Sequence, residues 1–264
     1  MAALVSRALA CMFLIAAPWV ARADPPPSVF LEDLTSPELA ARIRAGTTTV
    51  IVPVGGTEQN GAHMALGKHN VRVKILSERI ARALGNAVVA PVIAYVPEGG
   101  VNPPTGHMRY PGTITVPASV YRATIESAAR SLRLAGFRDI VLIGDSGDYQ
   151  KDNASVAAKL DKEWAGSPAR VRAIERYYRA ATAEFFDALR KQGFKDAEIG
   201  THAGLADTSL MLAVSPSLVR ADRLQTGEGV SGDPRHAKAE VGQGAVDAIV
   251  LQTAAAIRSA TQRQ

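Results

Sequence analysis

The sequence predicts an α/β domain in which a largely parallel sheet is covered by helices on both faces. Two observations support this fold class. Apolar runs rich in Val or Ile and bounded by Gly, Pro or Asp are typical of buried strands, and they occupy residues 48–54, 87–90 and 138–143. Apolar residues recur at helical spacing over residues 71–84, 118–135 and 154–165. Strands that alternate with helices favour parallel pairing, because each helix returns the chain across the sheet.

The N-terminal segment is predicted to be a cleaved secretory signal of 23 residues, outside the folded domain. It holds an apolar core over residues 8–17 and a small-x-small pattern at 21–23. The apolar core is too short to span a bilayer, and too little apolar sequence precedes Cys11 for a lipoprotein signal. We therefore expect a single domain over residues 24–264 that is periplasmic or secreted, without stable membrane association after cleavage.

The composition excludes two further classes of protein. Cys11 is the only cysteine in the sequence, so the mature chain has no disulfides, and its stability must come from core burial or assembly. The formal net charge of +5 falls to +3 when Arg7 and Arg22 leave with the signal. Because the remaining basic residues are dispersed, we expect no nucleic-acid partner.

Two insertions interrupt the alternation of strands and helices. Residues 96–117 are rich in Gly and Pro and are predicted to form a functional loop rather than a helix. Residues 170–192 are predicted to be helical. Their aromatic side chains are expected in the core or at a subunit contact; these are Tyr177, Tyr178, Phe185 and Phe186.

A polar loop over residues 57–70 directly follows the first predicted strand. It contains the carboxylate Glu58, the amide Asn60 and the imidazoles of His63 and His69. Ligands of parallel sheets collect at the carboxyl ends of strands, where such side chains can bind metal or transfer protons. The loop is therefore the first candidate for a reaction centre.

Several separate pieces of the chain, in a fixed order and spacing, resemble the creatininase family of metal-dependent amidohydrolases. The resemblance runs from about residue 48 to the C-terminal helix. Its pieces are residues 53–59 with Gly61, His63, Leu66 and Gly67, then 110–115, 136–143, 202–204, 208–212 and 232–234.

This resemblance implies a three-layer α/β/α enzyme, often a hexamer, that hydrolyses small amide or cyclic amide C–N bonds with two divalent metals. The family pattern places a Glu and a His two residues apart, a bridging Asp at the end of the loop, and a later His near an acidic residue. Here Glu58 is retained, but Asn60, His69 and Ser146 stand at the first His, Asp and later His positions. A neutral imidazole offers one free nitrogen, so His69 is not expected to bridge two metals.

The sequence therefore predicts one Zn or Mn ion rather than two, with a metal-free site as the alternative. The expected ligands are Glu58, His69, Asp145 and Asp148, a mixed oxygen and nitrogen set. The resemblance implies that His202 carries the proton and that Asp207 orients the site. Side chains expected in the second shell or against a small amide or peptide substrate are Asn60, His63, His107 and Ser146.

Other interpretations of the same residues stay open. Glu58 and Asn60 are also typical of helix caps, and Asp145 and Asp148 are also typical of turns after a strand. His63 and His202 are equally compatible with packing roles.

Two alternative functions also stay open. Ser146 follows a strand and, with Asp233 and His236, resembles the serine, aspartate and histidine of a GDSL-like serine hydrolase. Asn60 and Ser146 in ligand positions would also suit a metal-free scaffold that binds a small molecule without catalysis.

Overall fold

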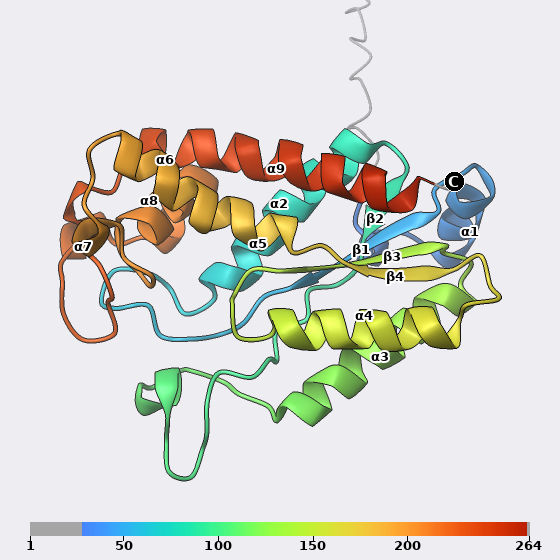
Figure 1. Cartoon of the computed structure of the whole chain (residues 1–264), viewed down its shortest axis with the longest axis horizontal. Helices are drawn as coiled ribbons and strands as arrows, with labels where there is room; N and C mark the ends of the chain where they lie inside the picture. Colours follow the sequence, from blue (N-terminus) through green and yellow to red (C-terminus); the bar gives the residue numbers. More distant parts are fainter. Residues whose placement is uncertain (1–27, 263–264) are drawn as a thin grey trace, which may run out of the picture.

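A four-stranded parallel sheet forms the centre of the protein (Figure 1). The computed structural model describes residues 28–262, so the predicted signal segment lies outside the described residues. The strands are β1 (Thr49–Val54), β2 (Ala87–Val89), β3 (Asp139–Gly144) and β4 (Arg170–Ala173), in the spatial order β2-β1-β3-β4.

Alternate residues of the central strands enter cores on opposite faces of the sheet. In β1, Ile51 packs into one core, whereas Val50 and Val52 pack into the other. In β3, Val141 and Leu142 divide in the same way. Both faces are therefore buried, which explains why the sequence of these strands is continuously apolar.

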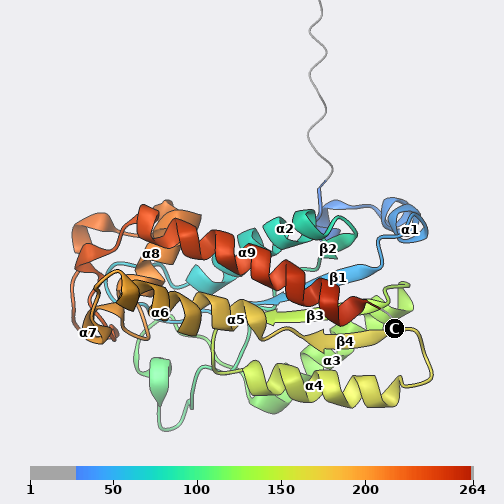
Figure 2. The ribbon, with the colours of Figure 1, turned by 45° about the horizontal axis from the view of Figure 1, so that its top comes forward.

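Helices cover each face of the sheet (Figure 2). The face that includes Ile51 packs against α2 (Lys68–Leu84), α5 (Arg176–Ala181) and α9 (Ala239–Thr261). The opposite face packs against α3 (Ala118–Leu134) and α4 (Gln150–Glu163). The predicted three-layer α/β/α sandwich is confirmed.

The other helices lie at the ends of the layers. They are α1 (Ser36–Arg44), α6 (Ala183–Lys191), α7 (Asp196–Ile199) and α8 (Leu205–Val214). Short 3₁₀ helices span Leu31–Asp33, Gly106–Arg109, Pro216–Leu218, Ala221–Arg223 and Pro234–His236. His107 lies in the 3₁₀ helix Gly106–Arg109, and His202 lies in the loop between α7 and α8.

The structure confirms the three predicted strands and three predicted helices to within a few residues. It also confirms residues 96–117 as a loop, with one 3₁₀ helix inside it. The prediction that residues 170–192 are helical throughout is wrong at the start, because Arg170–Ala173 forms β4 beside β3. β4 is an edge strand with only Val171 fully buried, so it lacks the apolar run that identified the other strands.

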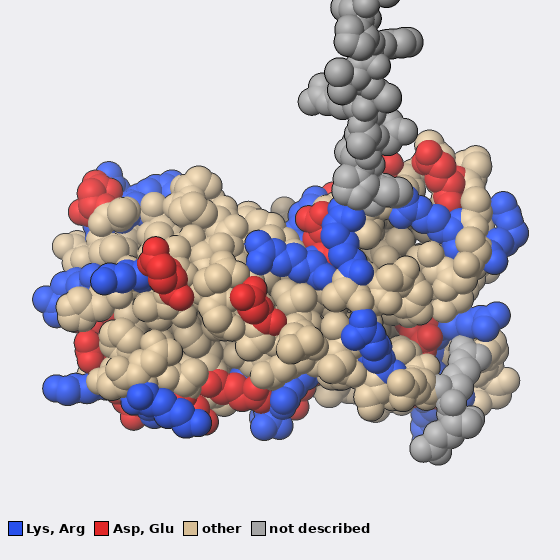
Figure 3. All heavy atoms as spheres, turned by 90° about the horizontal axis from the view of Figure 1, so that it is seen from above, with Lys and Arg blue, Asp and Glu red and all other residues tan. Residues whose placement is uncertain are grey.

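Charged side chains are dispersed over the surface. On the face seen in Figure 3, Lys and Arg alternate with Asp and Glu and do not form a continuous basic patch. Among the helices of residues 28–262, none combines the length and hydropathy required to cross a bilayer.

Candidate functional site

A cavity of about 260 Å³ lies beyond the carboxyl ends of β1 and β3. Glu58 reaches it from the loop after β1, and His69 from the first turn of α2. Asp145 reaches it from the loop after β3. Segments distant in sequence add His107 and His202, so the fold collects candidate chemical groups at the position expected for a parallel sheet.

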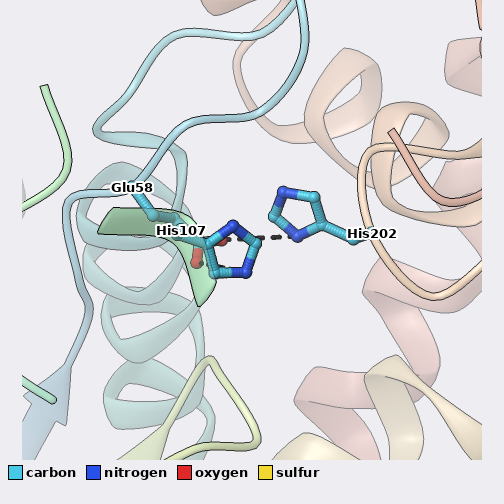
Figure 4. A group of neighbouring side chains, drawn as sticks. All are labelled: Glu58, His107 and His202. Carbon is cyan, nitrogen blue, oxygen red and sulfur yellow. Dashed lines mark ion pairs between the residues drawn. The ribbon is translucent and has the colours of Figure 1, made fainter. Parts of the chain in front are cut away.

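Glu58, His107 and His202 form a cluster whose potential ligand atoms all lie within 4.8 Å of one another. Glu58 Oε2 is 3.4 Å from His107 Nε2, and Glu58 Oε1 is 3.6 Å from His202 Nδ1. Figure 4 shows the two imidazoles facing the carboxylate from separate loops. One carboxylate and two imidazoles suit Zn or Mn and leave a position for water.

Gln59 fixes the orientation of both histidines in this cluster. His202 Nε2 is 2.9 Å from the Gln59 carbonyl oxygen, so a proton donated there leaves the Nδ1 lone pair facing Glu58. The Gln59 side-chain Nε2 is 2.9 Å from His107 Nδ1. Groups that hold the second nitrogen of a ligating imidazole tune the affinity for metal.

We expect Gln59→Leu to weaken zinc binding by about 10–100-fold, because it removes the side-chain contact that orients His107. Competition with a chromogenic chelator measures this affinity. Gln192→Leu is the control, since Gln192 lies at the C-terminal end of α6, outside the cavity lining. Equal zinc affinity of Gln59→Leu and the control would contradict the orienting role.

His69 lies between two carboxylates. Its Nε2 is 2.8 Å from Glu58 Oε1, and its Nδ1 is 2.5 Å from Asp145 Oδ2. Both ring nitrogens are therefore engaged, and neither offers a free lone pair in this arrangement. The structure brings together Glu58, His69 and Asp145 as predicted, although it joins them by hydrogen bonds to the imidazole.

Two buried cations complete this network. Arg72 donates from Nε and NH2 to Asp145, at 2.9 and 2.7 Å from Oδ2, and from NH1 to Asp207 at 2.6 Å. Lys68 forms an ion pair with Asp207 and lies 3.5 Å from Glu58 Oε1. The hydroxyl of Tyr177 also donates to Asp145, at 2.6 Å.

The ion pairs determine the charge state of the site. Burial alone would raise the pKa of Asp145, but the charge of Arg72 lowers it. Burial would likewise raise the pKa of Asp207, but the charges of Lys68 and Arg72 lower it. Burial would lower the pKa of His69, but its hydrogen bonds to Asp145 and Glu58 raise it.

His202 differs from His69 in its charge state. Burial and the charge of Lys68 lower the pKa of His202 to about 4. His202 is thus a neutral imidazole at pH 7, the form that can bind metal.

Asp148 and Ser146 line the same cavity. Asp148 forms no hydrogen bond or ion pair with residues 28–262, and burial together with the charge of Glu58 raises its pKa. The predicted serine hydrolase set is not assembled: Asp233 pairs with Arg235, and His236 pairs with Glu198 at 3.2 Å. Neither Asp233 nor His236 lines the cavity that holds Ser146.

The remaining predicted residues lie behind the cavity wall. His63 is fully buried and its Nε2 is 3.0 Å from Thr208 Oγ1. Asn60 is also buried and donates to the carbonyl oxygens of Glu58 and Ala65, so it shapes the loop. The capping interpretation of Glu58 and Asn60 is wrong, because the N-cap of α2 is Gly67 without a side-chain cap bond.

Glu98 is a second buried carboxyl group near Glu58, in a loop whose sequence shows no ligand pattern. It is 2% exposed, and its protonated carboxyl group hydrogen-bonds to the carboxylate of Glu58. It packs against Gly56, where a Cβ would lie 2.6 Å from Glu98 Oε1. Burial and the charge of Glu58 raise the pKa of Glu98 to about 9.

This raised pKa predicts a specific pH dependence. Folded Glu98 keeps a proton that the unfolded chain releases above about pH 4.3, so the stability of the fold decreases as pH rises towards 9. Glu98→Gln should remove this effect and increase the free energy of unfolding by about 3 kcal/mol at pH 7. Urea unfolding at pH 5 and pH 7 measures it. The surface variant Glu78→Gln should show neither change, and equal pH slopes for wild type and Glu98→Gln would contradict the assignment.

Lys68, Arg72, Tyr177, Tyr178 and Gln59 also belong to the site. The sequence contained a signal for two of them. Lys68 and Arg72 are four residues apart and therefore share one face of a helix, the same face that approaches the end of β1. The predicted helix begins at residue 71, whereas α2 begins at Lys68. With the earlier start, the sequence places both cations on the helix face next to the polar loop.

Comparison with known proteins is consistent with this geometry. A family model described as Creatininase, creatinine amidohydrolase, matches residues 32–257. A creatinine amidohydrolase from Pseudomonas putida is 30% identical over 202 residues, which cover 75% of this chain and 76% of the relative. A mycofactocin precursor peptide peptidase from Mycobacterium ulcerans is 27% identical over 195 residues, covering 68% of this chain and 63% of the relative.

Solved structures give the same result. A crystal structure of creatinine amidohydrolase superimposes with a TM-score of 0.75 at 25% identity and covers 90% of this chain and all of the other. A structure described as creatininase Mn has a TM-score of 0.72 at 26% identity, with the same coverage. A match to the family model over most of the chain, together with the shared fold, shows that the chain belongs to the creatininase family.

Proposed function

We propose that this protein is an exported amidohydrolase that hydrolyses a small amide, cyclic amide or peptide C–N bond with one divalent metal ion. The observation that supports this most directly is the cluster of Glu58, His107 and His202 at the edge of the cavity. The neutral state of His202 and the lowered pKa of Glu58 leave both groups in the form that binds cations.

The donor set fits one ion of Zn or Mn, the metals named for solved creatininase structures, one of which is described as Zn-Zn type. It replaces the predicted set of Glu58, His69, Asp145 and Asp148 in this proposal, because the nitrogens of His69 are engaged by carboxylates. When bound, the ion would polarise the substrate carbonyl and lower the pKa of a coordinated water.

The protein groups divide the remaining tasks. Asp148 faces the cavity without a partner and keeps its proton to a higher pH than an ordinary carboxyl group, so it is suited to pass a proton to the leaving nitrogen. Asp207 accepts the N–H of Ala203 at 3.0 Å and thereby fixes the turn that carries His202. In this proposal His202 acts as a ligand, whereas the resemblance to the family implied that it carries the proton.

We also propose that the protein is exported and forms a homo-oligomer. The segment over residues 1–23 supports export, and the resemblance to hexameric enzymes supports a homo-oligomer. N-terminal sequencing of the periplasmic protein tests the cleavage site, and light scattering on the purified protein tests the assembly.

Metal analysis joined to an activity screen tests the enzyme function. The purified mature chain should contain about one Zn or Mn ion per chain. It should hydrolyse at least one member of a panel of lactams, creatinine, short-chain amides and small peptides, lose activity in a chelator and regain it with Zn or Mn. Metal-free protein that binds these compounds without cleaving them would support the binding scaffold instead. Fluorophosphonate labelling that Ser146→Ala abolishes would support the serine hydrolase.

A further inference from the structure

Lys68 places a buried ammonium group next to the proposed metal cluster. It is the first residue of α2, and its side chain is 1% exposed. Its Nζ lies 3.5 Å from Glu58 Oε1 and closer still to Asp207 Oδ2. Lys68 also lines the cavity that holds the cluster, so its positive charge faces the same space.

Helix stability does not explain a cation at this position. The N-terminal end of a helix carries partial positive charge, which disfavours a lysine in its first turn. Removal of an ammonium group from water costs several kcal/mol unless carboxylates compensate it. Glu58 and Asp207 provide that compensation. The burial of Lys68 is therefore explained by its contacts with these two carboxylates and not by its place in the helix.

Of the carboxylates that line the cavity besides Glu58, Asp145 and Asp207 already bind donor groups of the protein, and Asp148 is the single one without such a partner among the described residues. Asp145 accepts hydrogen bonds from Arg72, His69 and Tyr177. Asp207 pairs with both Lys68 and Arg72. An ion bound to Asp145 or Asp207 would have to displace some of these donors, and each displaced donor would lose a buried partner.

A charge count of the buried network leads to the same conclusion. Three carboxylates, Glu58, Asp145 and Asp207, already face Lys68 and Arg72. Two of them also hydrogen-bond to the two ring nitrogens of His69. Little negative charge is therefore left uncompensated, and a second divalent ion would add two further positive charges to a buried site.

We propose that the ammonium group of Lys68 takes the place of a second metal ion. It limits the cluster to one divalent cation and supplies the second positive charge that faces the substrate. This inference rests on the proposed single-metal function, and it assigns to Lys68 a role that is separate from metal ligation.

Two substitutions of Lys68 separate its charge from its volume. Lys68→Ala removes the charge and leaves space between Glu58 and Asp207, whereas Lys68→Met removes the charge but fills the space. Wild type and both variants are equilibrated with excess zinc, desalted and analysed for Zn per chain by mass spectrometry. Circular dichroism establishes that each is folded. Thermal unfolding with and without zinc gives a readout that needs no substrate.

We expect one zinc ion per chain in wild type and two in Lys68→Ala. Lys68→Met lacks the charge and should also bind more zinc than wild type. One ion in Lys68→Met beside two in Lys68→Ala would overturn the role of the charge, because only the volume of the side chain would then set the limit. Zinc should also raise the melting temperature of Lys68→Ala more than that of wild type. Two ions in wild type would overturn the inference whether or not the variants fold, as would a folded Lys68→Ala protein that gains no ion. If wild type binds no zinc, the proposed metal-dependent function fails. If Lys68→Ala nevertheless binds one ion in that case, the result would still support the inference that the ammonium group of Lys68 takes the place of a metal ion.

Discussion

Glu58→Gln is expected to reduce the affinity for zinc by at least about 100-fold. Loss of a group that only hydrogen-bonds to a metal ligand costs about 10–100-fold in affinity, and loss of a ligand should cost at least as much. Glu58 is the carboxylate shared by His107 and His202 in the cluster. An uncharged amide keeps the shape of the side chain but is a much weaker ligand for a divalent cation. Hydrolysis of any substrate found by the activity screen should decrease in parallel. Chelator competition and the activity of the zinc-loaded variant measure the two effects.

Glu163→Gln provides a matched control for this experiment. Glu163 lies on α4 and forms an exposed ion pair with Arg130, far from the cavity lining. Its substitution should leave zinc affinity and hydrolysis unchanged. If Glu58→Gln retained a tightly bound ion at the wild-type affinity, the cluster of Glu58, His107 and His202 would not be the metal site.

Asp145→Asn is expected to lower the free energy of unfolding by about 3–5 kcal/mol, the cost of breaking a buried ion pair. The Asp145 side chain is completely buried and accepts from Arg72, His69 and Tyr177. The amide leaves the guanidinium of Arg72 in the protein interior with less compensating charge. Urea denaturation at pH 7 measures the loss.

The effect of Asp145→Asn should depend on pH in a defined direction. The folded-state pKa of Asp145 is lowered, so its stabilising contribution is complete above the unfolded pKa of about 3.9. That contribution is lost as pH falls through the folded-state value. The difference between wild type and variant should therefore shrink below about pH 4. Glu126→Gln, which breaks surface pairs with Arg130 and Lys159, should cost at most about 1 kcal/mol. A cost equally small for Asp145→Asn would contradict the structural role.

The central strands and the helices that cover them were predictable because their signals are local. Continuous apolar runs identify β1 and β3, whose two faces are buried, and helical periodicity identifies α2 and α3. β4 was missed because an edge strand with one buried residue has no such pattern. Its place in the sheet depends on pairing with β3, a contact that lies outside its own sequence.

The sequence by itself determined the family, the sandwich fold and the loop that carries Glu58, because these depend on motifs whose residues lie close together along the chain. Only the tertiary structure decided which side chains meet. It brought His107 and His202 to Glu58 across long stretches of sequence, and it placed Lys68 and Arg72 against Asp207. It also placed both ring nitrogens of His69 in hydrogen bonds to the carboxylates of Asp145 and Glu58. The physical reason is that coordination and buried charge compensation depend on distances of a few ångströms, and the packing of loops and helices on the sheet sets those distances.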